Sequence, residues 1–337
     1  MKNSEGKKGN ILDVRDLVIH YELEESTVRA VEGMSFTLGY GETLAFVGET
    51  GAGKTTTALG LMRLVPSPPG RMVGGEIFFE GRDIMKASGE ELRAIRGEKI
   101  SFISQDPMTS LNPVMSVGSQ IAEMVVLHSG LSMRESRARA EEMLSLVGIR
   151  KERMGDYPHQ FSGGMRQRVL IAIALACSPA LLIADEPTSA LDVTIQAQVL
   201  NLMKGLKERF DTSMIMITHD LGIAAETCDR VAIIYAGRIV EMADTESLFT
   251  EALHPYAIGL FNSIPRIDDD RDLLDALPGL MPDPARLPQG CPFHPRCAHA
   301  SQECENSAPG LEDVGNGHLL ACWLRGKRNS EVGSVAQ

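Results

Sequence analysis

The pattern of hydrophobic and polar positions changes twice along the chain. Near its start, short runs rich in branched apolar residues alternate with polar turns, which is typical of β-strands. These runs predict strands at residues 11–19, 28–38, 44–47, 76–79 and 100–104. A helix is predicted from Lys54 to Leu64, because three prolines follow it closely and cannot continue a helix.

From Asp106 to about Ser178 the pattern becomes helical, and then strands return. The helical part predicts helices at 116–127, 132–147 and 163–177, and the strands that follow lie at 181–184 and 214–218. A hairpin is expected over 231–241, turning at Ala236-Gly237. Strands that alternate with helices, interrupted by a helical insert, predict an α/β core with a mostly parallel sheet.

After about residue 264 the composition shifts to Pro, Asp and Cys, and we place a domain boundary there. The predicted organisation is a core over 11–263 with its helical insert at about 106–178. A small Cys-rich C-terminal domain follows over 264–325. Residues 1–10 and 326–337 are expected to be disordered tails.

Composition and charge narrow the class of protein. Hydrophobic residues make up 43% of the 337 residues and charged residues 23%, which is ordinary for a globular protein. The net charge of −12 disfavours binding to nucleic acid, whose phosphates would repel the chain. No apolar run approaches the ~18–20 residues of a membrane span, and the polar start does not resemble a secretory signal. We therefore expect a cytosolic protein that reaches a membrane only through partners.

The clearest chemistry lies in Gly48-Glu49-Thr50-Gly51-Ala52-Gly53-Lys54-Thr55, which matches the phosphate-binding pattern G-x-x-x-x-G-K-S/T. The glycines allow backbone N–H groups to face phosphate oxygens, while Lys54 supplies a positive charge and Thr55 a hydroxyl for Mg²⁺. The helix that begins at Lys54 directs its positive end at the same anion. A plain glycine-rich turn is the alternative, but such a turn need not follow a strand and open a helix.

A second candidate site lies where the apolar run 181–184 ends in Asp185 and Glu186. Asp185 can hold Mg²⁺ through water, and Glu186 can polarise an attacking water molecule, as phosphoryl transfer requires. Taken alone, two acidic residues after a strand more often form an ordinary turn. Together with the phosphate loop, they predict nucleotide hydrolysis.

A third motif, Ser162-Gly163-Gly164, precedes the last helix of the insert. Ser162 is a suitable N-cap, and the two glycines leave backbone N–H groups exposed at the positive end of that helix. A capped helix start without further function is the alternative.

Taken together, these motifs resemble the nucleotide-binding subunits of ABC transporters. That family carries a signature, usually LSGGQ, between the phosphate loop and the second carboxylate motif. Here Ser162-Gly163-Gly164 has that place, with Phe161 and Met165 as departures at its flanks. Further matches are the Q-loop glutamine Gln105, the D-loop Ser189-Ala190-Leu191-Asp192, the switch histidine His219, and Tyr21 as the aromatic residue that stacks on adenine.

The resemblance implies a fold and a mechanism. The fold is an ATPase core of α/β class with an antiparallel β-subdomain and a helical subdomain. Two such chains face head to tail, so that Ser162, Gly163 and Gly164 serve the ATP of the partner chain. Glu186, His219 and Gln105 are the implied catalytic residues, and Thr55, Gln105 and Asp185 the implied Mg²⁺ ligands. The implied ATP-binding residues are Tyr21, Gly48, Glu49, Thr50, Gly51, Ala52, Gly53, Lys54, Thr55 and Thr56.

Longer stretches are similar to one branch of that family, the peptide and nickel importers. Residues 104–113 are similar to the Q-loop of dipeptide and oligopeptide permease ATPases, and residues 157–165 to their signature region. The stretches 254–256, 265–266, 288–291 and 295–297 are similar to their C-terminal extension. The implied function is ATP hydrolysis that energises peptide uptake at the cytoplasmic face of the membrane. The implied partners are a second ATPase subunit, two transmembrane permeases and an extracytoplasmic peptide-binding protein.

Three alternatives to that function stay open, and one of them is an iron–sulfur redox sensor whose ATPase activity is secondary. The same machinery could serve another solute, such as a nickel chelate, glutathione or an oligosaccharide. A soluble ABC ATPase that acts on nucleic acid is disfavoured by the single set of motifs and by the acidic charge.

Four of the six cysteines lie close together near the C-terminus: Cys291, Cys297, Cys304 and Cys322. In the cytosol such a group indicates metal binding more than disulfides. The spacing lacks the paired knuckles of most structural zinc sites. Members of the resembled family carry a 4Fe-4S cluster in this region, which the resemblance implies here. Zinc and four unligated buried thiols are the alternatives.

Overall fold

The computed structural model describes residues 9–189, 191–263 and 277–324. The predicted tail at 326–337 and most of the tail at 1–10 lie outside the described residues, and so does the predicted boundary at 264. None of the helices in the described ranges combines the length and apolar character that a membrane span requires.

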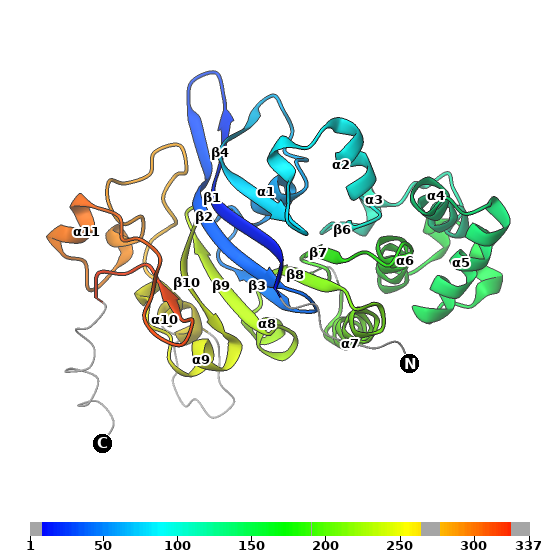
Figure 1. Ribbon diagram of the computed structural model, residues 1–337. Helices are drawn as coiled ribbons and strands as arrows, with labels where there is room; N and C mark the ends of the chain where they lie inside the picture. Colours follow the sequence, from blue (N-terminus) through cyan, green and yellow to red (C-terminus); the bar gives the residue numbers. More distant parts are fainter. Residues whose placement is uncertain (1–8, 190, 264–276, 325–337) are drawn as a thin grey trace.

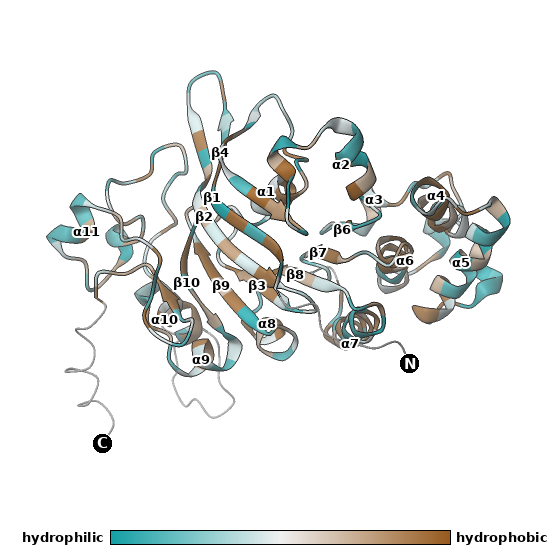
Figure 2. Ribbon diagram, in the orientation of Figure 1, coloured by the Kyte–Doolittle hydropathy of each residue, from teal (hydrophilic) through white to brown (hydrophobic). Residues whose placement is uncertain are grey.

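An eight-stranded sheet forms the centre of the molecule (Figure 1). In sheet order its strands are β11 (Glu312–Asp313), β12 (Leu319–Leu320), β10 (Arg238–Asp244), β9 (Arg230–Tyr235), β3 (Thr43–Val47), β8 (Ser213–Thr218), β7 (Leu181–Asp185) and β6 (Ile100–Ile103). The strands from β9 to β6 are parallel, whereas β10 turns back antiparallel to β9. Every residue of β3, β7 and β8 is buried, as expected for parallel strands that are covered on both faces. These strands are coloured as hydrophobic in Figure 2.

A second, antiparallel sheet packs against the first. Its strands, in order, are β2 (Thr27–Gly39), β1 (Asn10–Glu22), β4 (Gly70–Phe79) and β5 (Arg82–Asp83). The helix α1 (Lys54–Leu61) contacts β1 and β2 of this sheet and β7 of the core sheet. Side chains from both sheets share one apolar core, which includes Leu17, Phe36 and Phe46. The loop that precedes α1 is therefore anchored between two sheets.

The helices α4, α5 and α6 form a lobe at the side of the core sheet (Figure 1). The remaining helices in the described ranges surround the core sheet or connect its strands. The bounds of the helices after α1, those of the lobe included, are α2 (Gly89–Ile95), α3 (Pro107–Ser110), α4 (Val117–Ser129), α5 (Met133–Leu146), α6 (Gly163–Leu175), α7 (Val193–Phe210), α8 (Leu221–Thr227), α9 (Thr245–Thr250), α10 (Pro255–Asn262) and α11 (Gln302–Asn306).

The three helices predicted in the insert are confirmed within about one turn. Ser116, Ser132 and Ser162 each accept a hydrogen bond from a backbone N–H of the first turn and so fix where α4, α5 and α6 begin. The strands and the hairpin predicted around the core are also confirmed.

Two predictions about helices were wrong or incomplete. The helix predicted over 54–64 ends at Leu61, because Arg63 has a φ of 51°, which a right-handed helix does not contain. The 18-residue helix α7 was not predicted. It buries only one stripe, formed by Val199, Leu200, Met203 and Leu206, so its polar face weakened the apolar signal.

The C-terminal extension, which we define as residues 277–324, adds to the core sheet. Leu319 and Leu320 of β12 pair with Met242 and Glu241 of β10, and β11 pairs with β12. The sheet thus continues into a part of the chain that the sequence suggested to be separate. Folding of residues 264–325 as a domain of their own stays a prediction.

Candidate active site

The phosphate loop connects β3 to α1, and two of its glycines are required by close packing. A Cβ atom on Gly48 would lie 2.1 Å from the carbonyl oxygen of Ile234. A Cβ on Gly53 would lie 2.2 Å from the carbonyl oxygen of Ala30, and Gly53 has a φ of 100°, which favours glycine. The loop is therefore held against β9 and β2, and its shape is fixed by the fold.

Lys54 begins α1 and is 6% exposed. Its Nζ donates hydrogen bonds to the carbonyl oxygens of Gly48 at 2.6 Å and Glu49 at 2.9 Å. Burial lowers the pKa of Lys54, and the carboxylates of Glu186, Asp185 and Glu49 act in the opposite direction. The loop carbonyls thus orient an ammonium group before any phosphate is bound.

Thr55 and Asp185 meet at the end of β7. The Thr55 hydroxyl donates a hydrogen bond of 2.8 Å to Oδ2 of Asp185. Burial raises the pKa of Asp185, and the Thr55 hydrogen bond acts in the opposite direction. A carboxylate and a hydroxyl at this position are oxygen donors of the kind that Mg²⁺ prefers.

Glu186 lies between two side chains from neighbouring strand ends. Nε2 of Gln105 donates to its Oε2 at 2.8 Å, and Nδ1 of His219 lies 3.1 Å from its Oε1. The φ of Glu186 is 46°, a left-handed conformation that costs energy for a residue with a Cβ. Gln105, Glu186 and His219 follow β6, β7 and β8, so the carboxyl ends of parallel strands gather these groups at one edge.

A cavity of about 480 Å³ joins most of these residues, although Asp185 itself does not line it. Its lining consists of Tyr21, Val28, Ala30, Thr50, Gly51, Gly53, Lys54, Thr55, Thr56, Gln105, Glu186, His219 and Pro284. Of the predicted ATP-binding residues, Gly48, Glu49 and Ala52 do not line it. Tyr21 does, and its hydroxyl lies 3.5 Å from Oγ1 of Thr56.

The signature residues lie elsewhere on this chain. Ser162 is exposed at the start of α6, and Ser162, Gly163 and Gly164 are absent from the cavity lining. A Cβ on Gly164 would lie 2.6 Å from Cγ2 of Ile195 in α7, so the signature packs next to the helix that Asp192 begins. One chain therefore presents the signature and Asp192 outward, apart from its own phosphate loop.

Comparisons with known proteins agree with this geometry. Residues 31–189 match the model of the ABC transporter family, and residues 240–304 match the oligopeptide/dipeptide transporter C-terminal region. A probable peptide ABC transporter ATP-binding protein of Sinorhizobium fredii is 49% identical, with 98% of each chain covered. An oligopeptide transport ATP-binding protein of Salmonella typhimurium is 50% identical over 93% of each chain.

The chain belongs to the ATP-binding subunits of the oligopeptide/dipeptide ABC transporter family. Its enzymatic class is accordingly that of the ABC ATPases. A dimeric ATP-binding cassette solved in a post-hydrolysis state with ADP and Pi has the same fold, with a TM-score of 0.63 and 26% identity. That similarity covers 69% of this chain and 98% of the cassette, so the cassette accounts for the ATPase core.

The extension that distinguishes this branch of ABC transporter subunits brings its four cysteines together. Cys291, Cys297, Cys304 and Cys322 line one small enclosed cavity, together with apolar groups such as Phe293 and Trp323. None of the six cysteines, all of which lie in the described ranges, forms a disulfide. Among the described residues, no three His, Cys, Asp or Glu side chains converge on a point suited to a single metal ion.

Sequence reasoning missed that this extension touches the ATP site. Pro284 lines the nucleotide cavity, and its carbonyl oxygen accepts a hydrogen bond of 2.9 Å from the backbone N–H of Arg29. A Cβ on Gly51 would lie 3.1 Å from Cε of Met281. Nothing in the local sequence around Met281 or Pro284 indicates this contact, because it joins distant parts of the chain.

Proposed function

We propose that this chain hydrolyses ATP in the cavity at the phosphate loop and that hydrolysis drives the uptake of peptides. One observation carries the proposal. The carboxylate of Glu186 is held between Gln105 and His219 in the same cavity as Lys54 and Thr55. A base oriented toward a phosphate-binding loop is what water attack on a terminal phosphate needs.

The residues take roles that follow from their chemistry. Backbone N–H groups of the loop residues that line the cavity and the Lys54 ammonium bind the phosphates, while Tyr21 stacks on the base. Thr55, Asp185 and Gln105 would hold Mg²⁺, which supplies positive charge to the phosphate oxygens when it is bound. Glu186 orients and deprotonates water, and His219 holds that carboxylate in place.

A second chain completes the site in this proposal. Ser162, Gly163 and Gly164 present a helix N-terminus outward, where it can bind the γ-phosphate of ATP held by a partner. The dimeric assembly of the similar ABC cassette supports this arrangement. We therefore propose pairing with a second ATPase subunit, in which Asp192 of the D-loop faces the partner.

The solute and the remaining partners follow from the relatives. Two of them are named for peptide or oligopeptide transport, and both match nearly the whole length of this chain. We propose that the chain sits on the cytoplasmic face of the membrane against two permease subunits. An extracytoplasmic peptide-binding protein delivers the solute to them.

The cysteine-lined cavity holds a 4Fe-4S cluster in this proposal. Each iron of such a cluster takes its own cysteine, so the four thiolates surround the cluster and do not meet at one atom. Four cysteines that line one small cavity support a metal site there, and the resemblance to the family implies the cluster over zinc. Its role would be to hold residues 277–324 together, since large apolar side chains are sparse there.

Substitution of the proposed base tests the ATPase assignment. In a complex reconstituted with permeases, Glu186→Gln should bind ATP and turn it over at least about a hundredfold more slowly, because an amide cannot accept the proton. Glu80→Gln is the matched control, since Glu80 is a partly buried, ion-paired glutamate away from the cavity. Normal turnover by Glu186→Gln would remove Glu186 from this role.

The solute is tested separately in the same vesicles. ATP-dependent accumulation of a labelled peptide is expected, and it should require the peptide-binding protein. Accumulation of a nickel chelate or an oligosaccharide in place of peptides would show that the proposed solute is wrong, while the ATPase assignment would still hold.

A further inference from the structure

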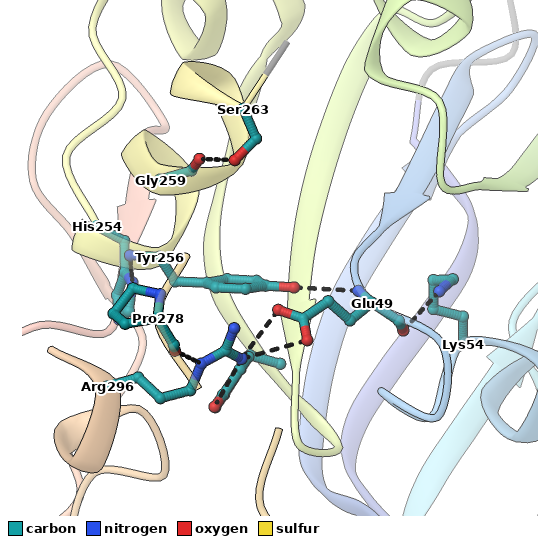
Figure 3. A network of polar contacts seen from close by, with 9 residues as sticks. Glu49, Lys54, His254, Tyr256, Gly259, Ser263, Pro278 and Arg296 are labelled. Carbon is teal, nitrogen blue, oxygen red and sulfur yellow. Dashed lines mark hydrogen bonds and ion pairs between the residues drawn. The ribbon is translucent and has the colours of Figure 1, made fainter. Parts of the chain in front are cut away.

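Glu49, the second residue of the phosphate loop, is held by three separate contacts (Figure 3). Its backbone carbonyl accepts a hydrogen bond from Lys54, and its backbone N–H donates one of 3.0 Å to the hydroxyl of Tyr256. Its carboxylate points away from Lys54 toward Arg296 of the C-terminal extension. Glu49 does not line the nucleotide cavity, so its carboxylate is directed at the protein and not at a ligand.

Arg296 is the partner of that carboxylate and is itself almost completely buried. Its Nη1 donates to Oε1 and Oε2 of Glu49 at 2.9 and 3.2 Å, and its side chain is 6% exposed. Nε of the same guanidinium donates at 2.8 Å to the carbonyl oxygen of Pro278. The Glu49 side chain is 30% exposed, so the bond is part-buried, and a charge-assisted bond of this kind is stronger and more directional than a surface ion pair.

An aromatic cluster holds both Arg296 and Glu49 in position. The rings of Tyr235, Tyr256 and Phe293 lie with centroids 4.6 to 5.5 Å apart, and the Arg296 guanidinium lies 5.7 Å from the Tyr235 ring centroid. Tyr256 is fully buried. The same cluster therefore supports the arginine that binds the carboxylate of Glu49 and the hydroxyl that binds its N–H.

We propose that Arg296 is a positioning residue for the phosphate loop, through which the C-terminal extension sets the affinity for nucleotide. Arg296 fixes Glu49, and Glu49 fixes Lys54 through its carbonyl oxygen. A loop that is held in its binding conformation loses less conformational freedom when phosphate binds. The inference rests on the proposed ATP site, since it concerns the same loop.

The position of Arg296 gives this contact a second consequence. Arg296 directly precedes Cys297, whose thiol lines the cysteine cavity. We expect a displacement of the backbone at Cys297 to act on the neighbouring guanidinium that holds Glu49. The cysteine cavity and the ATP cavity are thus connected through adjacent residues and one ion pair.

Nucleotide binding by the purified chain tests the inference. Arg296→Gln is expected to raise the Kd for ATP about fivefold to tenfold, which is the size of effect expected on losing one partly buried charge-assisted bond. Glu49→Gln should have a similar effect, and the double variant should be no weaker than either single variant because both remove the same contact. Arg296→Lys should restore part of the affinity by keeping the charge. In the reconstituted complex, Arg296→Gln should raise the KM for ATP more than it lowers kcat.

The control is Arg230→Gln, which removes a comparable part-buried pair with Glu42 at the opposite end of β9. A purely structural role predicts that Arg296→Gln lowers the melting temperature and leaves the Kd unchanged, which would overturn the inference. Fully additive effects of Arg296→Gln and Glu49→Gln would overturn it as well. If Arg296→Gln does not fold, the Kd values of Glu49→Gln and Arg296→Lys still test whether Arg296 positions the loop. Failure of the unsubstituted chain to bind ATP would instead refute the proposed function.

Discussion

The nucleotide cavity and the cysteine-lined cavity differ in how their polar side chains are held. In the nucleotide cavity, hydrogen bonds join Thr55 to Asp185 and both Gln105 and His219 to Glu186. The cysteine cavity is lined by the four cysteines, three histidines and several apolar groups, and burial raises the pKa of Cys291 and raises that of Cys322 to about 11. Hydrogen bonds hold the carboxylates of the first site, whereas burial in the second disfavours the thiolate form that a metal requires.

This difference indicates what each site requires from a bound group. A preorganised polar site needs little rearrangement when its ligand arrives, so substitutions there reduce function more than stability. A cavity lined by thiols gains order from the metal that it binds, so substitutions there reduce stability first. The predictions below test that contrast.

The largest expected effect is the loss of ATP turnover in Lys54→Ala. This change removes the ammonium that the carbonyls of Gly48 and Glu49 orient, so the phosphates lose their principal positive contact. Turnover in the reconstituted complex should be undetectable, with a melting temperature close to that of the unsubstituted chain. Lys99→Ala, which removes a surface pair with Glu80, is the control. Turnover within a few-fold of normal in Lys54→Ala would contradict a preorganised site.

A change at the cysteine cavity should act on metal content and stability. Cys322→Ser removes one proposed ligand, and the extension should lose roughly 2–5 kcal/mol, the range for losing a covalent staple in a small domain. Protein purified without oxygen should contain about four irons per chain, as the cluster formula implies, and the variant should contain fewer. Cys177→Ser, in a cysteine outside this cavity, should keep the iron. Zinc in place of iron would refute the cluster and keep the metal site.

The smallest expected effect concerns the stability of the nucleotide cavity itself. Burial raises the pKa of Asp185 above the ordinary value of 3.8, so its ionised form is disfavoured in the folded chain. The contribution of Asp185 to the free energy of unfolding is therefore fully present below pH 3.8, where the carboxyl is protonated. It is lost as the pH rises through the pKa that Asp185 has in the folded chain. Asp185→Asn should therefore raise the free energy of unfolding at pH 7 by about 0.5–2 kcal/mol.

Denaturant titrations of nucleotide-free protein at pH 7 and near pH 3 check this prediction. The stability gained by Asp185→Asn should vanish at the lower pH, because Asp185 is then protonated and is as neutral as the asparagine that replaces it. Glu24→Gln, in an exposed loop, should change little at either pH. A loss of stability in Asp185→Asn at pH 7 would mean that the Thr55 hydrogen bond outweighs the cost of burial.

Local signals were sufficient to predict much of the core. The apolar strand before Gly48, the carboxylates after β7 and the serine caps of α4, α5 and α6 are each encoded within a few neighbouring residues. The structure gathers Lys54, Asp185 and Glu186 because strand ends meet at one edge of a parallel sheet.

The contacts of the extension could not be predicted in that way. Arg296 and Glu49 are 247 positions apart, and neither has an unusual local sequence. Pro284 lies in a proline-rich stretch that has no helical or strand period. Tertiary packing alone decides which loop such a segment touches, whereas the periodic patterns of the core already indicate a buried face.

The pairing of β12 with β10 has a consequence for how the protein is made. The ribosome releases β10 long before β12, so the outer edge of β10 stays unpaired while the extension is still being synthesised. Open strand edges with apolar flanks pair readily with other chains, and Ile239 to Ala243 of β10 are all buried in the finished protein. A message cut short within the extension would therefore yield a chain that has every phosphate-loop residue but tends to aggregate.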